Sequence, residues 1–155
     1  MKLPPVKIAL ITPAKPGSRH GNRGTVLRWA AMLRELGHVV SVQVDWDGRP
    51  TDLMLALHAR RSAASIRNYA VCYPDQPLIL ALTGTDLYRD IRTDEEAQAS
   101  MQLATRMIVL QDMGLAELAP ALRRKTRVVY QSEPVVKRQP PLKSCFEIVV
   151  SGHLR

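Results

Sequence analysis

The chain has little of several residue types, and each shortage excludes a class of protein. It contains only two cysteines, Cys72 and Cys145, with no CxxC pair and no histidine at a metal-ligand spacing. A disulfide framework and a metal site are therefore not expected. We predict a reduced protein that holds neither a metal nor a cofactor.

Long apolar runs are also missing. No stretch approaches the roughly 20 apolar residues that a membrane span needs. The apolar run from Val6 to Ile11 is too short for the core of a signal peptide. We expect a cytoplasmic protein that has no contact with a membrane.

Aromatic residues make up only 5% of the chain, with a single phenylalanine. This shortage disfavours single-stranded nucleic acid as a partner, because such proteins stack bases on aromatic side chains. Positive charge, by contrast, is plentiful: the formal net charge is +8 over 155 residues. Such an excess favours an anionic partner and does not by itself choose between phosphates, nucleotides, nucleic acid and anionic lipid.

Short apolar runs alternate with segments that have a helical period, as in stacked βαβ units. We predict an α/β protein with a Rossmann-like, mostly parallel sheet and helices on both faces. The expected strands are 6–12, 38–44, 53–57, 77–82, 106–110 and 127–130. The expected helices are 23–36, 58–69, 94–104 and 113–124, the first with Asn22 as its N-cap and Gly37 as its C-terminal glycine.

The composition changes after residue 130. Residues 131–144 carry three prolines among polar and charged residues and are typical of a linker. Residues 145–150 are strand-like again. We therefore expect a Rossmann-like domain at 1–130, a linker at 131–144, and at 145–155 the start of a second domain that is absent from this chain. The unpaired strand could also pair with another copy, giving a homo-oligomer.

Three loops carry the candidate site residues, because ligands of open parallel sheets bind at the carboxyl ends of the strands. The first loop is long and basic and leads into a helix. The second and third follow the expected third and fourth strands. The candidates for binding an anion are Gly17, Arg19, Gly21, Asn22 and Arg23 in the first loop, His58, Arg60 and Arg61 in the second, and Thr83, Gly84, Thr85 and Arg89 in the third.

Simpler interpretations of these residues stay open. The loop glycines match neither GxGxxG nor a Walker A motif and could serve turns alone. Arg60 and Arg61 fit a solvated helix face about as well as a ligand site. A lone histidine such as His58 is a weak signal, and Asp86 could be a helix cap. Asp86 is also the only acid of this set that could act as a catalytic base.

Several stretches resemble the N-terminal half of the selenosugar synthases of selenoneine biosynthesis. They are KIALITPAKPGSRHGNRGTVLRWAAMLRELGH, LHARRSAASI, ALTGTDLYRDI and VVYQS, of which TGTDLYRD is the most specific, and VVSGHLR is similar to the first strand of the second domain. These enzymes are similar to the family-four glycosyltransferases, which have two Rossmann-like domains facing a cleft (the B-type fold).

The resemblance implies a transferase that moves a hexose, typically N-acetylglucosamine, from a UDP-sugar to selenophosphate. In that fold the first domain holds the acceptor and the second holds most of the nucleotide sugar, so this chain alone should be inactive. The alternative is a basic Rossmann-like module that binds nucleic acid or another polyanion without catalysis.

Overall fold

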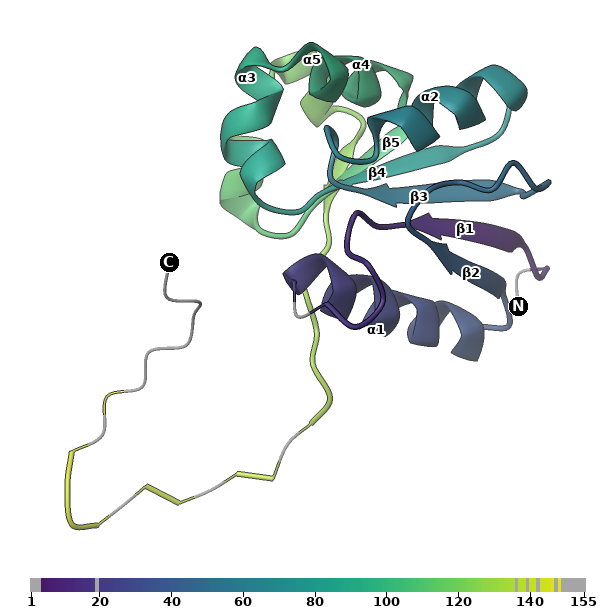
Figure 1. Cartoon of the computed structure of the whole chain (residues 1–155). Helices are drawn as coiled ribbons and strands as arrows, with labels where there is room; N and C mark the ends of the chain where they lie inside the picture. Colours follow the sequence, from purple (N-terminus) through teal and green to yellow (C-terminus); the bar gives the residue numbers. More distant parts are fainter. Residues whose placement is uncertain are drawn as a thin grey trace.

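The computed structural model describes residues 4–18, 20–135, 137–138, 140–141, 143–146 and 148. These residues fold around one sheet with the strand order β2-β1-β3-β4-β5-β6, in which every neighbouring pair is parallel (Figure 1). The strands are β1 (Lys7–Ile11), β2 (Val39–Gln43), β3 (Leu53–Leu57), β4 (Leu78–Leu82), β5 (Arg106–Val109) and β6 (Thr126–Val128). The predicted α/β class and Rossmann-like sheet are confirmed.

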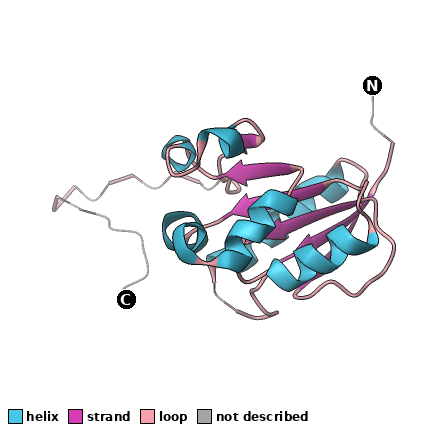
Figure 2. Cartoon of the chain, turned by 90° about the horizontal axis from the view of Figure 1, so that it is seen from above, coloured by secondary structure: helices cyan, strands magenta, loops and turns pink. Residues whose placement is uncertain are grey.

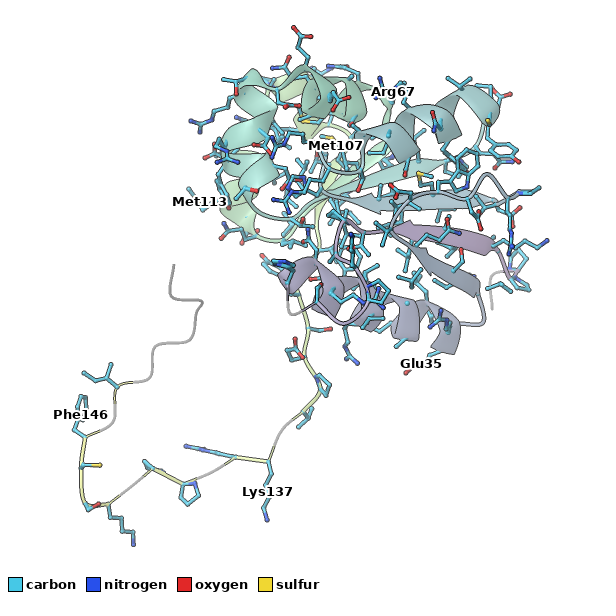
Figure 3. All side chains as sticks on the ribbon, in the orientation of Figure 1. Glu35, Arg67, Met107, Met113, Lys137 and Phe146 are labelled. Carbon is cyan, nitrogen blue, oxygen red and sulfur yellow. The ribbon has the colours of Figure 1, made fainter. Side chains whose placement is uncertain are left out.

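Helices cover both faces of the sheet, as expected for strands that are apolar on both sides (Figure 1, Figure 2). α1 (Gly21–Glu35) packs Val26, Trp29 and Ala30 against one face. The opposite face carries α2 (Ala63–Cys72) and α4 (Glu95–Leu103). Figure 3 shows Met107 of β5, which is fully buried, between the sheet and these helices.

Residues 44–52 join β2 to β3 without a helix. Trp46 fixes this segment to α2: its ring meets Tyr69 edge-on with the ring centroids 5.4 Å apart. Its backbone N–H also donates to Ser65 Oγ at 3.0 Å. The aromatic contact and the hydrogen bond together let an irregular segment replace a crossover helix on this face.

Helix boundaries differ from prediction more than strand boundaries do. α1 begins two residues early, with His20 rather than Asn22 at the N-cap position. Gly37, with φ +95°, follows the cap as predicted and adopts the left-handed conformation that glycine tolerates best. α2 begins at Ala63 instead of residue 58, because residues 58–62 form a loop held by tertiary contacts described below.

The predicted helix over 113–124 was wrong. Its place is taken by a 3₁₀ turn, η2 (Asp112–Leu115), and the short α5 (Pro120–Arg123). Pro120 lacks the N–H that a continuous helix needs, and Gly114 lies so close to β5 that an added Cβ would be 3.0 Å from Val109 Cβ. Residues 86–93 form helical turns that were not predicted, namely η1 (Asp86–Asp90) and α3 (Ile91–Thr93).

After β6 the chain passes α1, where Gln131 Oε1 lies 3.4 Å from Thr25 Oγ1. The described residues beyond it belong to no helix or strand, and Figure 3 shows Lys137 and Phe146 well away from the sheet. Of the predicted strand 145–150, Cys145, Phe146 and Ile148 are not in a strand, and the other three residues lie outside the described residues. In the described part of the chain, no helix is long and apolar enough to cross a membrane.

Candidate anion site at the carboxyl edge of the sheet

The strand order places a topological switch point between β1 and β3. The chain leaves β1 toward β2 on one side, and it leaves β3 toward β4 on the other. Ligands of open parallel sheets bind in the crevice at such a point, outside the carboxyl ends of the strands. The loops that border it are residues 12–20 after β1 and residues 58–62 after β3, both of which carry predicted site residues.

The loop after β1 is fixed at its base and exposed at its tip. Thr12 is buried, and its hydroxyl accepts a hydrogen bond from Ala14 N at 3.3 Å. Gly17 is exposed with φ +80°, a turn conformation that favours glycine. Gly21, Asn22 and Arg23 form the first turn of α1, where Gly21 is exposed and the other two are half-buried. Arg19 lies outside the described residues.

The loop after β3 begins with a strained residue. His58 has φ +76°, although its side chain favours negative values, and it is only 3% exposed. Its backbone N–H donates to Ala81 O of β4 at 2.9 Å. A residue persists in this conformation only when the surrounding structure holds it there, and such residues gather at functional sites.

Asp86 joins the β3 loop to the β4 loop. Its carboxylate is fully buried. Oδ2 accepts from Ala59 N at 3.0 Å, and Oδ1 accepts from Thr83 N at 3.1 Å and from Gly84 N at 2.9 Å. Three donated hydrogen bonds and complete burial suit Asp86 to holding the two loops together better than to taking a proton from a substrate.

The His58 imidazole lies between Asp86 and Thr85. Its Nδ1 is 4.0 Å from Asp86 Oδ2, and its Nε2 is 3.4 Å from the Thr85 hydroxyl oxygen. Burial lowers the pKa of His58 below its ordinary value of 6.5, and the neighbouring Asp86 charge opposes that effect only in part. The imidazole is therefore neutral at neutral pH.

A second buried carboxylate, Asp90, positions two arginines. Arg60 Nε lies 3.1 Å from Asp90 Oδ2 and Arg89 Nε lies 3.1 Å from Asp90 Oδ1. The contact with Arg60 is an ion pair without hydrogen-bond geometry. Sequence reasoning missed Asp90, because only the fold brings Arg60 next to a residue 30 positions away. A carboxylate directly after Arg89 was the one local signal.

The structure thus brings together the predicted residues of the second and third loops. Asp86 contacts His58, Thr83 and Gly84. His58 in turn contacts Thr85, and Asp90 contacts Arg60 and Arg89. Arg61 is exposed beside them. Within the described ranges, no hydrogen bond or ion pair joins the first loop to this group, so strand order alone relates Gly17, Gly21, Asn22 and Arg23 to it.

Two surface hollows lie elsewhere. One, of about 230 Å³, lies between α2 and α4 and is lined partly by Arg67, which Figure 3 shows on the α2 side of the molecule. The other, of about 280 Å³, lies beside residues 46–51. Neither of these two hollows includes a predicted site residue. Among the described residues, no cluster of three or more histidine, cysteine, aspartate or glutamate side chains could hold a metal ion.

No model of a known protein family matches the sequence, and the comparison with curated proteins finds no match. The resemblance to selenosugar synthases therefore rests on the quoted motifs alone.

Proposed function

We propose that this domain binds a small phosphate-type anion at the carboxyl edge of its sheet. The observation that carries the proposal is the Asp86 carboxylate, which ties the β3 and β4 loops together beside the switch point. The loops that it joins carry Arg60 and Arg89, which pair with Asp90, and the exposed Arg61 and Thr85. Guanidinium groups and a hydroxyl are the donors that a phosphate oxygen prefers.

We further propose that the intact protein is a cytoplasmic glycosyltransferase of which this domain is the acceptor half. The resemblance supports selenophosphate as the acceptor and a UDP-sugar, typically UDP-N-acetylglucosamine, as the donor. Selenium would form a bond to the anomeric carbon while the bond from that carbon to the UDP oxygen breaks, and UDP would leave with the electron pair. Because selenophosphate is already an anion, this attack needs no residue to remove a proton.

The role of the chain in that reaction is binding and orientation. Aligning two reactants supplies a large part of a transfer rate, and the donor would be held by a second Rossmann-like domain. The 155-residue chain is therefore expected to bind the acceptor without transferring sugar. Asp86, proposed from sequence as a base, is better suited by its contacts to fixing the loops that bind the acceptor.

The proposal is tested by titrating the purified chain with inorganic phosphate and then with selenophosphate, using isothermal calorimetry. Loss of one charge-assisted contact removes about 1.5–3 kcal/mol, which corresponds to roughly ten- to a hundredfold in affinity. Arg60→Ala and Arg61→Ala should each show a loss of this size. Arg67→Ala is the matched control, because Arg67 lies on α2 in an exposed pair with Glu96.

Equal affinity in all three variants would contradict the site. Tight, salt-dependent binding of random oligonucleotides with no binding of phosphate would favour the alternative of a polyanion-binding module. A mass spectrum showing selenosugar formed by the chain alone from UDP-N-acetylglucosamine and selenophosphate would contradict the assignment of an acceptor half.

A further inference from the structure

The strained backbone of His58 is not explained by phosphate binding alone. Among the described residues, it is the only non-glycine residue with a positive φ. Its imidazole is buried and so cannot itself be the main contact of a ligand at the edge. With this backbone conformation the buried imidazole lies next to the exposed Thr85, with Nε2 3.4 Å from the Thr85 hydroxyl oxygen.

The contacts of the ring determine its tautomer. The Arg61 backbone N–H points at Nδ1, with a nitrogen-to-nitrogen distance of 3.4 Å. A backbone N–H can only donate, so Nδ1 must carry a lone pair. The Asp86 carboxylate, 4.0 Å from Nδ1, is too far away to accept a hydrogen bond. It already accepts from three backbone groups. The neutral ring therefore carries its proton on Nε2.

The tautomer then sets the direction of the neighbouring hydroxyl. Nε2–H faces the Thr85 hydroxyl oxygen at 3.4 Å, a long contact in which Nε2 donates. Because that oxygen accepts from His58, its own proton must point elsewhere. Within the described part of the chain, the Thr85 hydroxyl has no other hydrogen-bond partner, and the residue is exposed at the edge.

We propose that His58 is a positioning residue that makes Thr85 a hydrogen-bond donor to an oxyanion bound at the carboxyl edge. The polarity runs from the Arg61 N–H through the imidazole to the Thr85 hydroxyl and then to the ligand. Thr85 thereby determines specificity: it favours an unprotonated phosphate-type oxygen over a ligand that presents a hydrogen there. This inference rests on the proposed function for its ligand, whereas the tautomer can be measured without one.

The low pKa of His58 agrees with this arrangement. Burial outweighs the attraction of Asp86 and Asp90, and the charges of Arg60 and Arg61 also favour the neutral ring. An imidazolium would carry a second proton on Nδ1, facing the Arg61 N–H, and that N–H would lose its acceptor.

The first test is a long-range ¹⁵N–¹H correlation spectrum of the full chain at neutral pH, with His58→Asn used to assign the signal. Asparagine tolerates positive φ better than most residues, so this variant keeps the loop conformation. We expect a protonated Nε2 and an unprotonated Nδ1. A proton on Nδ1, alone or together with one on Nε2, would overturn the proposal.

The second test is the affinity for inorganic phosphate. Thr85→Val, which removes the hydroxyl at constant shape, should weaken binding roughly tenfold or more, because the lost bond goes to a charged acceptor. Thr85→Ser should restore most of the affinity. Thr93→Val, at an exposed threonine at the end of α3, is the matched control and should change nothing. Circular dichroism would confirm that each variant is folded.

The outcomes separate this inference from the proposed function. Phosphate binding that is equal in Thr85→Val and wild type would overturn the inference and leave the anion site standing on its arginines. Failure of the wild-type chain to bind phosphate would overturn the proposed function and, with it, the role of Thr85, whichever tautomer His58 has.

Discussion

Replacing Asp86 with alanine tests whether one buried carboxylate holds the site together. The change removes the acceptor of three backbone N–H groups, from Ala59, Thr83 and Gly84. A hydrogen bond to a charged group contributes about 1.5–3 kcal/mol, and a buried donor left without a partner costs about 1–3 kcal/mol. The three bonds share one side chain, so their contributions do not simply add.

Burial decides which of the three donors costs most. Ala59 is fully buried, so its N–H has no access to water once the carboxylate is gone. Thr83 and Gly84 are half-buried, and water can replace part of what they lose. We expect Asp86→Ala to reduce the free energy of unfolding by about 3–5 kcal/mol. A domain of this size has about 5–15 kcal/mol in total.

The assay is urea unfolding followed by circular dichroism, with Asp94→Ala as the control. Asp94 is also a carboxylate that accepts from a backbone N–H, but from one only, as the N-cap of α4, with Oδ1 2.8 Å from Ala97 N. Loss of such a cap costs about 1 kcal/mol. If Asp86→Ala is no more destabilising than Asp94→Ala, Asp86 does not hold the loops together. The sequence-based hypothesis that Asp86 is a catalytic base would then be favoured again.

Two further predictions concern packing and pH. Gly114→Ala should destabilise the domain by about 1–3 kcal/mol in the same assay, because its Cβ would press on Val109. Gly24→Ala is the control: Gly24 lies inside α1 and an added Cβ there would meet no atom within 4 Å, so this variant should stabilise the domain by about 0.5–1 kcal/mol. Equal effects of the two substitutions on stability would contradict the close contact at Gly114. The lowered pKa of His58 means that the unfolded chain binds its proton first, so wild type should lose stability relative to His58→Asn as the pH falls below 6.5. Parallel stability curves for wild type and His58→Asn would contradict burial of a neutral imidazole.

The strands could be predicted from sequence because each is a continuous apolar run that ends at turn residues. All six lie within two residues of their predicted bounds. The helix expected from residue 58 fails at its start for a tertiary reason. Its alanines and arginines favour a helix locally. However, the hydrogen bond from Ala59 N to Asp86 fixes residues 58–62 in a loop, and the positive φ of His58 is incompatible with a helix. No local pattern predicts a contact between residues 27 positions apart.

For the candidate site, only the position of the loops at the strand ends was predictable from sequence. The rule that ligands bind at strand ends placed His58, Thr83 and Thr85 on one edge. In the structure Asp86 contacts His58 and Thr83, and His58 contacts Thr85. The identity of the joining residue and the second carboxylate, Asp90, required the three-dimensional contacts. A sequence shows which cations are present near an edge, and only the fold shows which of them a carboxylate holds in place.

Part of the chain's net positive charge lies at this edge of the sheet. Arg60 and Arg89 pair with Asp90, and Arg61 is exposed next to Arg60 in the same loop. The two buried carboxylates, Asp86 and Asp90, offset two of these three guanidinium charges. One positive charge is left over, which a phosphate-type anion would offset at close range. A neutral sugar would leave that charge in place, and this mismatch is why we propose an anionic acceptor rather than the hexose as the ligand of this edge.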